Sequence, residues 1–192
     1  MIQPPGSSVR KASMDKSFEI LSGLRHPVIV EYGMTRHADS WEGDGFSTIL
    51  FAHFIAQQPC GGTLFSIDIN PYSILASDHL MKKYEIPQRD IFLICADAMD
   101  FMHQAKLELV DLLYLDAWDY GGDDVQKEES ALHHLEAFQR SEKWLKSGSL
   151  VLIDDILNQD TLVGKGQYLI PHLKGIGYEE LHRGYQFLFR KP

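Results

Sequence analysis

The chain has 192 residues, of which 44 % are hydrophobic, and a formal net charge of −9 from 18 Lys and Arg against 27 Asp and Glu. This length is enough for one domain with a sizeable core, and the hydrophobic content excludes a disordered chain. The acidic balance, without a basic run, argues against nucleic acid or an anionic membrane as a partner, because phosphate groups bind clustered Lys and Arg. No run approaches the ~20 apolar residues of a membrane span, and residues 1–16 lack the apolar core of a signal peptide, so we expect a cytoplasmic protein.

The first half of the chain alternates short apolar runs with helical patterns. Residues 1–27 read as a loosely packed lead-in with a short helix at 18–24, and residues 28–192 as the domain. The β-branched run at 28–32 predicts a strand that is buried on both faces. A helix is predicted at 46–57, a strand at 63–68, a helix at 72–84 after Pro71, and a strand at 91–95. Cys95, inside the last of these runs, is expected to be a buried free thiol.

The second half continues the alternation and then changes it. A fourth strand is predicted at 112–116, a long helix at 125–145 that Gly148 closes, and a fifth strand at 150–154. A short helix at 166–173 precedes two strands, 178–182 and 185–190, that flank a tight turn at Arg183 and Gly184. The whole pattern predicts an α/β fold: a single Rossmann-like domain with a mostly parallel, doubly wound sheet and a C-terminal antiparallel hairpin.

Acidic residues follow the predicted strands, namely Glu31, Asp68, Asp97 and Asp116, and the fifth strand ends in Asp154 and Asp155. Parallel strands place such residues at one crevice, where ligands bind. A carboxylate after the second strand suits a ribose diol, and the accumulated negative charge suits a cationic ligand. The first turn contains no GxGxxG, so a pyrophosphate has no obvious cradle; Arg36 is the one basic residue there. If the fourth and fifth strands are neighbours, Asp116, Asp154 and Asp155 converge in a way that suits a hard divalent cation.

Several of these motifs together resemble the class I S-adenosylmethionine-dependent methyltransferases. The resemblance runs from about Val28 to Arg190 and rests on Glu31-Tyr32-Gly33, Gly45-Phe46-Ser47-Thr48, Asp68, Asp97-Ala98 and Asp116. It implies that Glu31 and Gly33 line the methionine end of S-adenosylmethionine, that Asp68 holds the ribose and that Asp97 with Ala98 meets the adenine. Ser47 and Ile69 complete the cofactor-binding residues that it implies.

The narrower pattern Asp116…Asp154-Asp155 resembles the metal triad of the magnesium-dependent O-methyltransferases, including the macrocin-type group. It implies Mg²⁺ on those three residues. The chain departs from the group in its longer loop after Gly33 and in having Asp119 where catechol-type members carry a lysine base. The catalytic candidates are therefore Asp116, Asp119 and His134 on the long helix. Without a metal, Asp119, His134 or solvent would take the proton.

Each of these residues also has a purely structural interpretation. Asp68 could cap the helix that Pro71 starts, Asp97 competes with Asp100 for a cap, and His134 could be a satisfied, half-buried histidine. The pair Asp154-Asp155 needs compensation, from a metal ion or from a basic partner such as Lys165. Gly164-Lys165-Gly166 could bind an anion or form a plain turn. Trp41, Trp118 and Tyr120 could wall a substrate pocket or anchor loops.

The sequence therefore predicts an S-adenosylmethionine-dependent methyltransferase that O-methylates a small hydroxylated molecule, with a divalent metal at the acceptor site. An alternative is a non-catalytic domain of the same fold that binds a nucleoside ligand or a partner chain. A nicotinamide-dependent reductase is a third reading, against which the missing GxGxxG counts. A homodimer that completes the pocket walls is left open.

Overall fold

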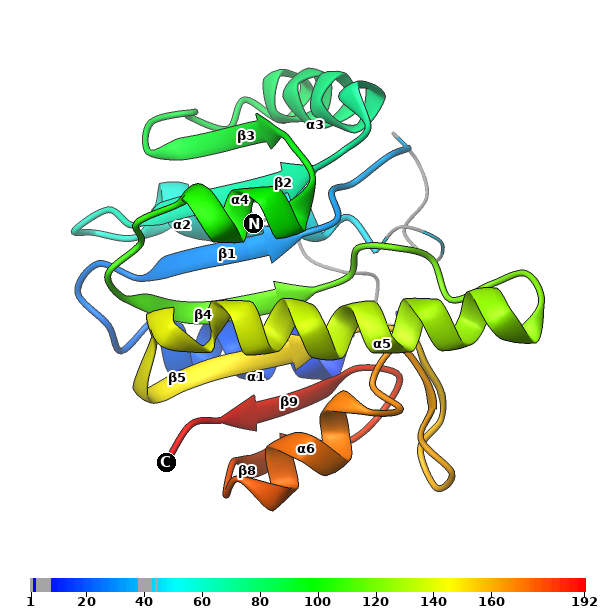
Figure 1. The fold of residues 1–192 in the computed structure, drawn as a ribbon. Coiled ribbons are helices and arrows are strands. Elements are labelled where there is room, and N and C mark those ends of the chain that lie inside the picture. Colours follow the sequence, from blue (N-terminus) through cyan, green and yellow to red (C-terminus); the bar gives the residue numbers. More distant parts are fainter. Residues whose placement is uncertain (1, 3–7, 38–42, 44) are drawn as a thin grey trace.

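A seven-stranded sheet in the order β3-β2-β1-β4-β5-β9-β8 is the frame of the computed structural model, which describes residues 2, 8–37, 43 and 45–192 (Figure 1). The strands are β1 (Val28–Tyr32), β2 (Thr63–Asp68), β3 (Ile91–Cys95), β4 (Val110–Leu115), β5 (Leu145–Ile153), β8 (Glu179–His182) and β9 (Phe187–Arg190). The first five are parallel, while β9 pairs antiparallel with β5 and β8 antiparallel with β9. The predicted fold class is confirmed, including the closing hairpin.

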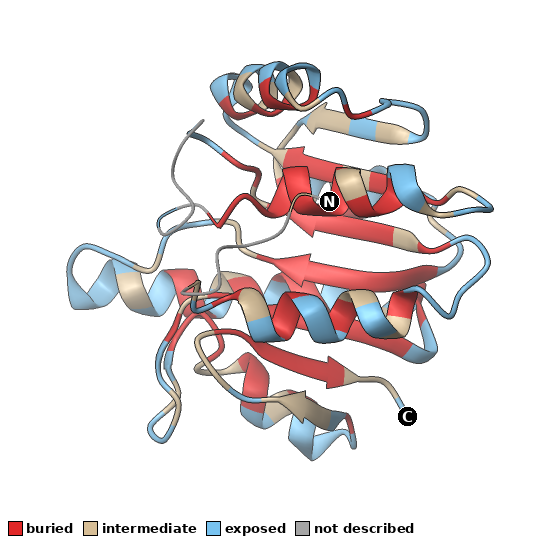
Figure 2. Ribbon diagram, turned by 180° about the vertical axis from the view of Figure 1, so that it is seen from behind, coloured by how far each residue is buried: buried red, intermediate tan, exposed pale blue. Residues whose placement is uncertain are grey.

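Helices cover both faces of this sheet. They are α1 (Lys11–Leu21), α2 (Ser47–Gln57), α3 (Pro71–Lys83), α4 (Ala98–Gln104), α5 (Asp124–Ser141) and α6 (Leu169–Gly175). Alternate residues of the central strands belong to two separate cores: Leu113 and Val151 pack with α4, α5 and α6, whereas Leu112 and Leu150 pack with α1, α2 and α3. The two cores explain why the central strands are apolar along their whole length, and Figure 2 shows them buried.

The strand order reverses between β1 and β4, which are direct neighbours in the sheet. From β1 the chain moves outward to β2 and β3, and then crosses back to β4 and β5. In an open parallel sheet this reversal leaves a crevice at the carboxyl ends of the strands. The acids that follow β1, β2 and β4 belong to this edge.

The N-terminal helix differs from its prediction. It begins earlier, at Lys11, and its residues Met14 and Leu21 are fully buried in the core with α2, so residues 11–21 are not loosely packed. Its apolar residues are too sparse for a clear helical pattern, since serines such as Ser13 and Ser17 take buried positions as well. Ser13 Oγ and Ser17 Oγ donate hydrogen bonds to the carbonyls of Arg10 and Ser13, which lets these polar residues face the core.

Several other elements also differ from their prediction. The long helix α5 ends at Ser141, a 3₁₀ turn (Glu142–Trp144) follows, and Gly148 lies inside β5 at φ +86° instead of closing the helix. A short ribbon of β6 (Ile156–Asn158) and β7 (Val163–Gly164) follows β5 and, like α4, was not predicted. Cys95 is free, as expected, but exposed, because β3 is an edge strand.

Within the described residues, no helix is both long and apolar enough to cross a bilayer.

Candidate functional site

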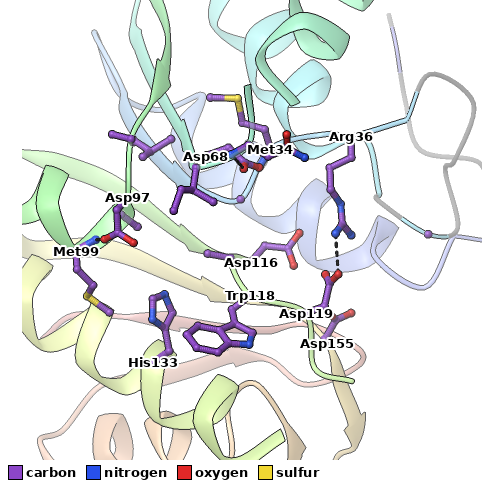
Figure 3. Close-up of a pocket in the computed structure, with 18 of the residues that line it drawn as sticks. Met34, Arg36, Asp68, Asp97, Met99, Asp116, Trp118, Asp119, His133 and Asp155 are labelled. Carbon is purple, nitrogen blue, oxygen red and sulfur yellow. Dashed lines mark hydrogen bonds and ion pairs between the residues drawn. The ribbon is translucent and has the colours of Figure 1, made fainter. Parts of the chain in front are cut away.

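A cavity of about 470 Å³ opens at the carboxyl ends of β1, β2, β3 and β4, at the reversal of strand order (Figure 3). Eight predicted site residues share its wall with other residues from the loops after these strands. The principal lining residues are Gly33, Met34, Asp68, Ile69, Asp97, Ala98, Met99, Asp116, Trp118, Asp119, His133 and Asp155. The strand-end acids Asp68, Asp97, Asp116 and Asp155 therefore do meet around one space, whereas Glu31 and Asp154 are buried and do not line it.

Gly33 forms part of the cavity wall where β1 passes close to the end of β4. Its φ is +90°, and a Cβ atom there would lie 2.7 Å from the backbone carbonyl carbon and oxygen of Asp116. Its own N–H donates to the carbonyl of Ile67 at 2.9 Å. Only glycine accommodates both this φ and this close approach, so the turn brings main chain instead of side chain to the cavity.

Asp68 ends β2 with its carboxylate held by two backbone amides. Oδ2 accepts from Met34 N–H at 3.0 Å and Oδ1 from Asn70 N–H at 2.8 Å. Asp68 does not cap α3, because the cap is Asn70, whose side chain accepts from Tyr72 N–H at 3.0 Å. A fixed carboxylate with remaining lone pairs on the cavity wall is suited to accept hydrogen bonds from a diol. Ile69 lies beside it, largely exposed, as an apolar wall.

Asp97 and Ala98 stand where β3 turns into α4. Asp97 caps this helix, since its Oδ1 accepts from Met99 N–H at 2.8 Å and from Asp100 N–H at 3.2 Å. The competition between Asp97 and Asp100 for the cap is thus decided in favour of Asp97. Both Asp97 and Ala98 also line the cavity, and Figure 3 shows the side chain of Asp97 at its wall.

Glu31 and Ser47, two predicted cofactor residues, do not line the cavity. Both are buried behind its wall, and the carboxylate of Glu31 accepts a hydrogen bond from Ser66 Oγ. Burial raises the pKa of Glu31 to about 7, although nearby hydroxyls including that of Ser66 oppose the shift. Glu31 Oε1 and Ser47 Oγ have no hydrogen-bond partner within the described residues.

The acids predicted to bind metal do come together, but two cations lie among them. Lys165 Nζ is 2.6 Å from Asp116 Oδ1 and 2.9 Å from Asp155 Oδ2. Arg10 Nε is 2.8 Å from Asp154 Oδ2, and an Arg10 terminal nitrogen is 3.3 Å from Asp155 Oδ1. Among the described residues no group of three or more acids, histidines or cysteines could hold a metal ion, so this geometry gives the metal-triad prediction no support. The segment Gly164-Lys165-Gly166 is a turn whose lysine is buried against these acids, so the lysine does not face an anion site.

Burial and charge act against each other in this acid cluster. Burial raises the pKa of Asp116 well above its usual range, and the carboxylates of Asp154 and Asp155 add to this, while Lys165 opposes it. Burial would lower the pKa of Lys165, but the carboxylates of Asp116, Asp155 and Asp154 together outweigh burial and keep the ammonium charged. Burial would raise the pKa of Asp155, but Lys165, Tyr185 and Arg10 together outweigh burial and lower that pKa. The side chain of Asp116 stays partly open to the cavity, and Tyr114 Oη donates to it at 3.2 Å.

The two predicted proton acceptors, Asp119 and His134, differ sharply in their surroundings. Asp119 lies on the rim, well exposed, 2.7 Å from Arg36 Nη1. His134 is buried and outside the cavity wall, and burial lowers its pKa to about 3; its Nδ1 lies 2.6 Å from the carbonyl of Ser130. Of the adjacent histidines 133 and 134 on α5, His133 is the one that lines the cavity, and its ring centre lies 5.3 Å from that of Trp118. His134 is thus a buried core residue and not the satisfied, half-buried histidine of its structural interpretation, since within the described residues its Nε2 has no hydrogen-bond partner. His133, and not His134, contacts the loop after β4.

Sequence reasoning missed His133, Met99 and Arg10 on the wall. A sequence signal existed for two of them: His133 lies on the predicted long helix, and Met99 lies in the first turn after the strand-end acid Asp97. No sequence signal marked Arg10. Trp118 also has a positive φ of +55°. Such a φ is rare for a large side chain, and residues with strained backbone of this kind are frequent at functional sites. Of the other aromatic candidates, Trp41 lies outside the described residues, as does most of the loop between Thr35 and Asp44.

Comparison with known proteins gives structural matches only. No family model matches the chain, and no curated protein matches it. It is similar in structure to the O-methyltransferase TomG of Streptomyces achromogenes in complex with SAM (TM-score 0.63, 14 % identity, covering 98 % of this chain and 83 % of that one). It is also similar to an O-methyltransferase of Bacillus cereus in complex with SAH (TM-score 0.64, 13 % identity, covering 98 % and 84 %) and to a putative caffeoyl-CoA O-methyltransferase of Staphylococcus aureus (TM-score 0.63, 16 % identity, covering 93 % and 83 %).

These likenesses extend over nearly the whole chain and over most of each matched protein. At such low identity they speak for the arrangement of the chain and not for its substrate. The chain has the fold of the class I S-adenosylmethionine-dependent methyltransferases.

Proposed function

We propose that this protein binds S-adenosylmethionine in the cavity and transfers its methyl group to an oxygen of a small hydroxylated molecule. The observation that carries the proposal is Asp68, an acid at the end of β2 that two backbone amides fix on the wall of a 470 Å³ cavity. In a doubly wound sheet, an acid at this position is suited to the hydroxyls of a ribose. The class I fold of the whole chain supports the same ligand.

The cofactor would lie along the β1–β2–β3 side of the cavity. Asp68 would accept the ribose hydroxyls, Ile69 and Ala98 would contact the adenine, and Asp97 would accept from its exocyclic amine. The main chain at Gly33 would pass close to the methionine end. Glu31 and Ser47 would support this turn from behind, since neither lines the cavity. The sulfonium charge of the cofactor suits a wall that carries several carboxylates.

The acceptor would lie on the β4–α5 side, among Asp116, Trp118 and His133 (Figure 3). Its hydroxyl oxygen would form a bond to the methyl carbon as the carbon–sulfur bond breaks, leaving S-adenosylhomocysteine. Asp116 would take the proton from that hydroxyl, because its side chain borders the cavity, whereas Asp119 faces Arg36 and His134 is buried. Alignment of the oxygen with the methyl group is the main contribution of such a site.

A divalent metal is not part of this proposal. The oxygens that would bind Mg²⁺ already accept hydrogen bonds from Lys165 and Arg10, and a hard cation at that point would have to displace an ammonium or guanidinium group.

Isothermal titration calorimetry with S-adenosylmethionine and S-adenosylhomocysteine tests the cofactor assignment. We expect saturable binding of both, and a loss of about 10-fold or more in affinity for Asp68→Ala, because charge-assisted hydrogen bonds contribute about 1.5–3 kcal/mol. Glu108→Ala is the matched control, since it removes an exposed acid that precedes β4 at the opposite edge of the sheet. Absence of saturable heat for both ligands with folded wild-type protein would refute the proposal.

Turnover with a panel of hydroxylated acceptors tests the chemistry, with S-adenosylhomocysteine release as the readout. Loss of a proton acceptor lowers turnover by about 10²–10⁴-fold, so we expect this loss for Asp116→Asn with unchanged cofactor affinity. Asp119→Asn should leave turnover within about 3-fold of wild type, because its carboxylate lies on the exposed rim. Equal losses in the two variants would contradict the assignment of Asp116.

A second candidate function is a non-catalytic domain that holds a nucleoside ligand. The ion pairs of Asp116, Asp154 and Asp155 favour it, because they tie up the predicted acceptor-side acids in buried pairs. Calorimetric binding of S-adenosylhomocysteine together with no turnover across the acceptor panel would select this candidate.

A further inference from the structure

Lys165 is a fully buried lysine at the carboxyl ends of β4 and β5. Its side chain has no exposed surface, and it follows β7, which pairs with β6. The N–H of Lys165 donates to the carbonyl of Asp155 at 3.3 Å, so the chain returns here to the residues that follow β5. Nζ contacts three oxygens: Asp116 Oδ1 at 2.6 Å, the Asp116 carbonyl at 3.0 Å and Asp155 Oδ2 at 2.9 Å. These three acceptors match the three N–H donors of an ammonium group. A charged lysine is tolerated at such depth only when it is paired in this way.

Arg10 supplies a second buried cation to the same cluster. Its side chain is 3 % exposed, and Nε lies 2.8 Å and 3.1 Å from the two carboxylate oxygens of Asp154. A terminal nitrogen lies 3.3 Å from Asp155 Oδ1, and the guanidinium stacks 4.8 Å from the ring centre of Tyr185. Every carboxylate of the cluster thus has a cation from the chain itself within 3.3 Å.

The position of Lys165 Nζ is the one that a bridging metal ion would need. Mg²⁺ binds carboxylate oxygens at about 2.0–2.1 Å with octahedral geometry. A divalent ion shared by Asp116 and Asp155 would lie in the space that Nζ already fills, and beside it the ion would repel a like charge in a buried environment. Tyr114 Oη, which donates to Asp154 at 2.7 Å and to Asp116 at 3.2 Å, takes up further lone pairs of the acids.

We propose that Lys165 is the built-in cation of this site: it takes the place of a divalent metal and holds the Asp116 carboxylate at the floor of the cavity. Lys165 is a positioning residue, because it touches Asp116 and Asp155 but does not line the cavity. The replacement of the metal follows from the geometry alone, whereas the positioning of Asp116 for catalysis rests on the proposed function.

Mn²⁺ binding, followed by electron paramagnetic resonance on the full chain without cofactor, tests the first part. We expect wild-type protein to show no saturable Mn²⁺ binding below about 1 mM, the weak end of protein sites for divalent cations. Lys165→Met should gain about 10-fold or more in Mn²⁺ affinity, because the like charge is removed while Asp116 and Asp155 remain. Lys146→Met is the matched control, since it removes the lysine that pairs with Asp111, a single buried acid, and should bind no Mn²⁺.

Two results would overturn the proposal. One is saturable Mn²⁺ binding by wild-type protein that Asp155→Asn abolishes; the other is a folded Lys165→Met variant whose Mn²⁺ affinity equals that of wild type. The wild-type measurement decides the question alone if Lys165→Met does not fold.

The positioning role is tested by turnover and by rescue. Turnover of wild-type protein should be unchanged by EDTA, and Lys165→Arg should retain more of it than Lys165→Met while both keep their affinity for S-adenosylhomocysteine. Loss of wild-type turnover in EDTA, restored by Mg²⁺, would refute the built-in cation. Loss of cofactor binding in the wild type would instead refute the proposed function and leave the Mn²⁺ result standing.

Discussion

At the residue scale, Glu31 matches the position of a predicted cofactor contact, but its side chain does not line the cavity. Its place at the end of β1 suits a cofactor contact, but its carboxyl group is fully buried beside Ser66. Burial favours the neutral acid, so the pKa rises from an ordinary 4.5 to about 7. Glu31 is therefore buried behind the cavity wall, and its contact with the cofactor stays a prediction.

This raised pKa makes the stability of the fold depend on pH. Between pH 4.5 and about 7 the folded state keeps the Glu31 proton and the unfolded state has lost it, so the free energy of unfolding falls as the pH rises. At 1.36 kcal/mol per unit of pKa, the total loss is about 3 kcal/mol. We expect denaturant unfolding at about pH 5 and about pH 8 to show this loss in wild type and not in Glu31→Gln, whose amide stays neutral.

The comparison between the two variants matters because His134 acts in the opposite direction. Its pKa is lowered to about 3 by burial, so its contribution to stability grows as the pH rises toward 6.5. His134 is present in both proteins, and the difference between them isolates Glu31. A pH dependence that is identical in wild type and Glu31→Gln would contradict the assignment.

Gly33 allows a second test at the same scale. In Gly33→Ala, the new Cβ would meet the Asp116 backbone at 2.7 Å at a φ of +90°, and we expect a loss of roughly 1–3 kcal/mol in the free energy of unfolding. Gly148→Ala is the control, since its φ is +86° but no atom lies within 4 Å of its Cβ position. If chemical denaturation shows equal losses for both variants, close approach to Asp116 is not the reason for glycine here.

At the scale of elements, α1 is joined to the sheet by both apolar packing and charge. Met14 and Leu21 lie in the core beside α2, and Arg10, at the start of the helix, reaches Asp154 at the end of β5. The helix therefore brings a wall residue to the cavity. A segment that reads as a lead-in in the sequence belongs to the site in the fold.

Removal of the Arg10 charge should be costly, because Asp154 is fully buried. A buried ion that loses its partner costs roughly 3–5 kcal/mol, so we expect Arg10→Gln to lower the free energy of unfolding by that amount. Lys16→Gln on the same helix is the control, since its pair with Glu19 is exposed and contributes within about 0.5 kcal/mol. Chemical denaturation measures both, and similar stabilities for the two variants would rule out a structural role for the Arg10–Asp154 pair.

At the scale of the whole molecule, the net charge of −9 and the chemistry of the site have to be considered separately. The strand-end acids contribute to the negative charge, but Lys165 and Arg10 balance two of the three charges of Asp116, Asp154 and Asp155. Among the described residues, Asp68 and Asp97 accept hydrogen bonds from backbone amides and have no ion pair. The cavity therefore has a largely balanced side near β4 and β5 and an acidic side near β2 and β3. This division agrees with a cofactor on one side and an acceptor on the other.

The sequence alone determined the features that depend on local pattern. Apolar runs of four to six residues, glycine turns and helical spacing predicted the parallel strands, most of the helices and the closing hairpin. Because parallel strands end at one edge, it also predicted that Asp68, Asp97 and Asp116 would share a cavity. Edge and centre could not be told apart this way, so Cys95 was expected to be buried and is exposed.

Only the tertiary structure decided which partner each acid has. Arg10 and Asp154 are 144 positions apart, and Lys165 and Asp116 are 49 apart, so no local pattern records either pair. The same holds for His133 and His134, whose burial depends on how α5 rotates against β4. Spacing along the chain brings carboxylates to one edge of a sheet, but the balance of burial, charge and hydrogen bonds that fixes their chemistry arises from side chains that meet only when the chain is folded.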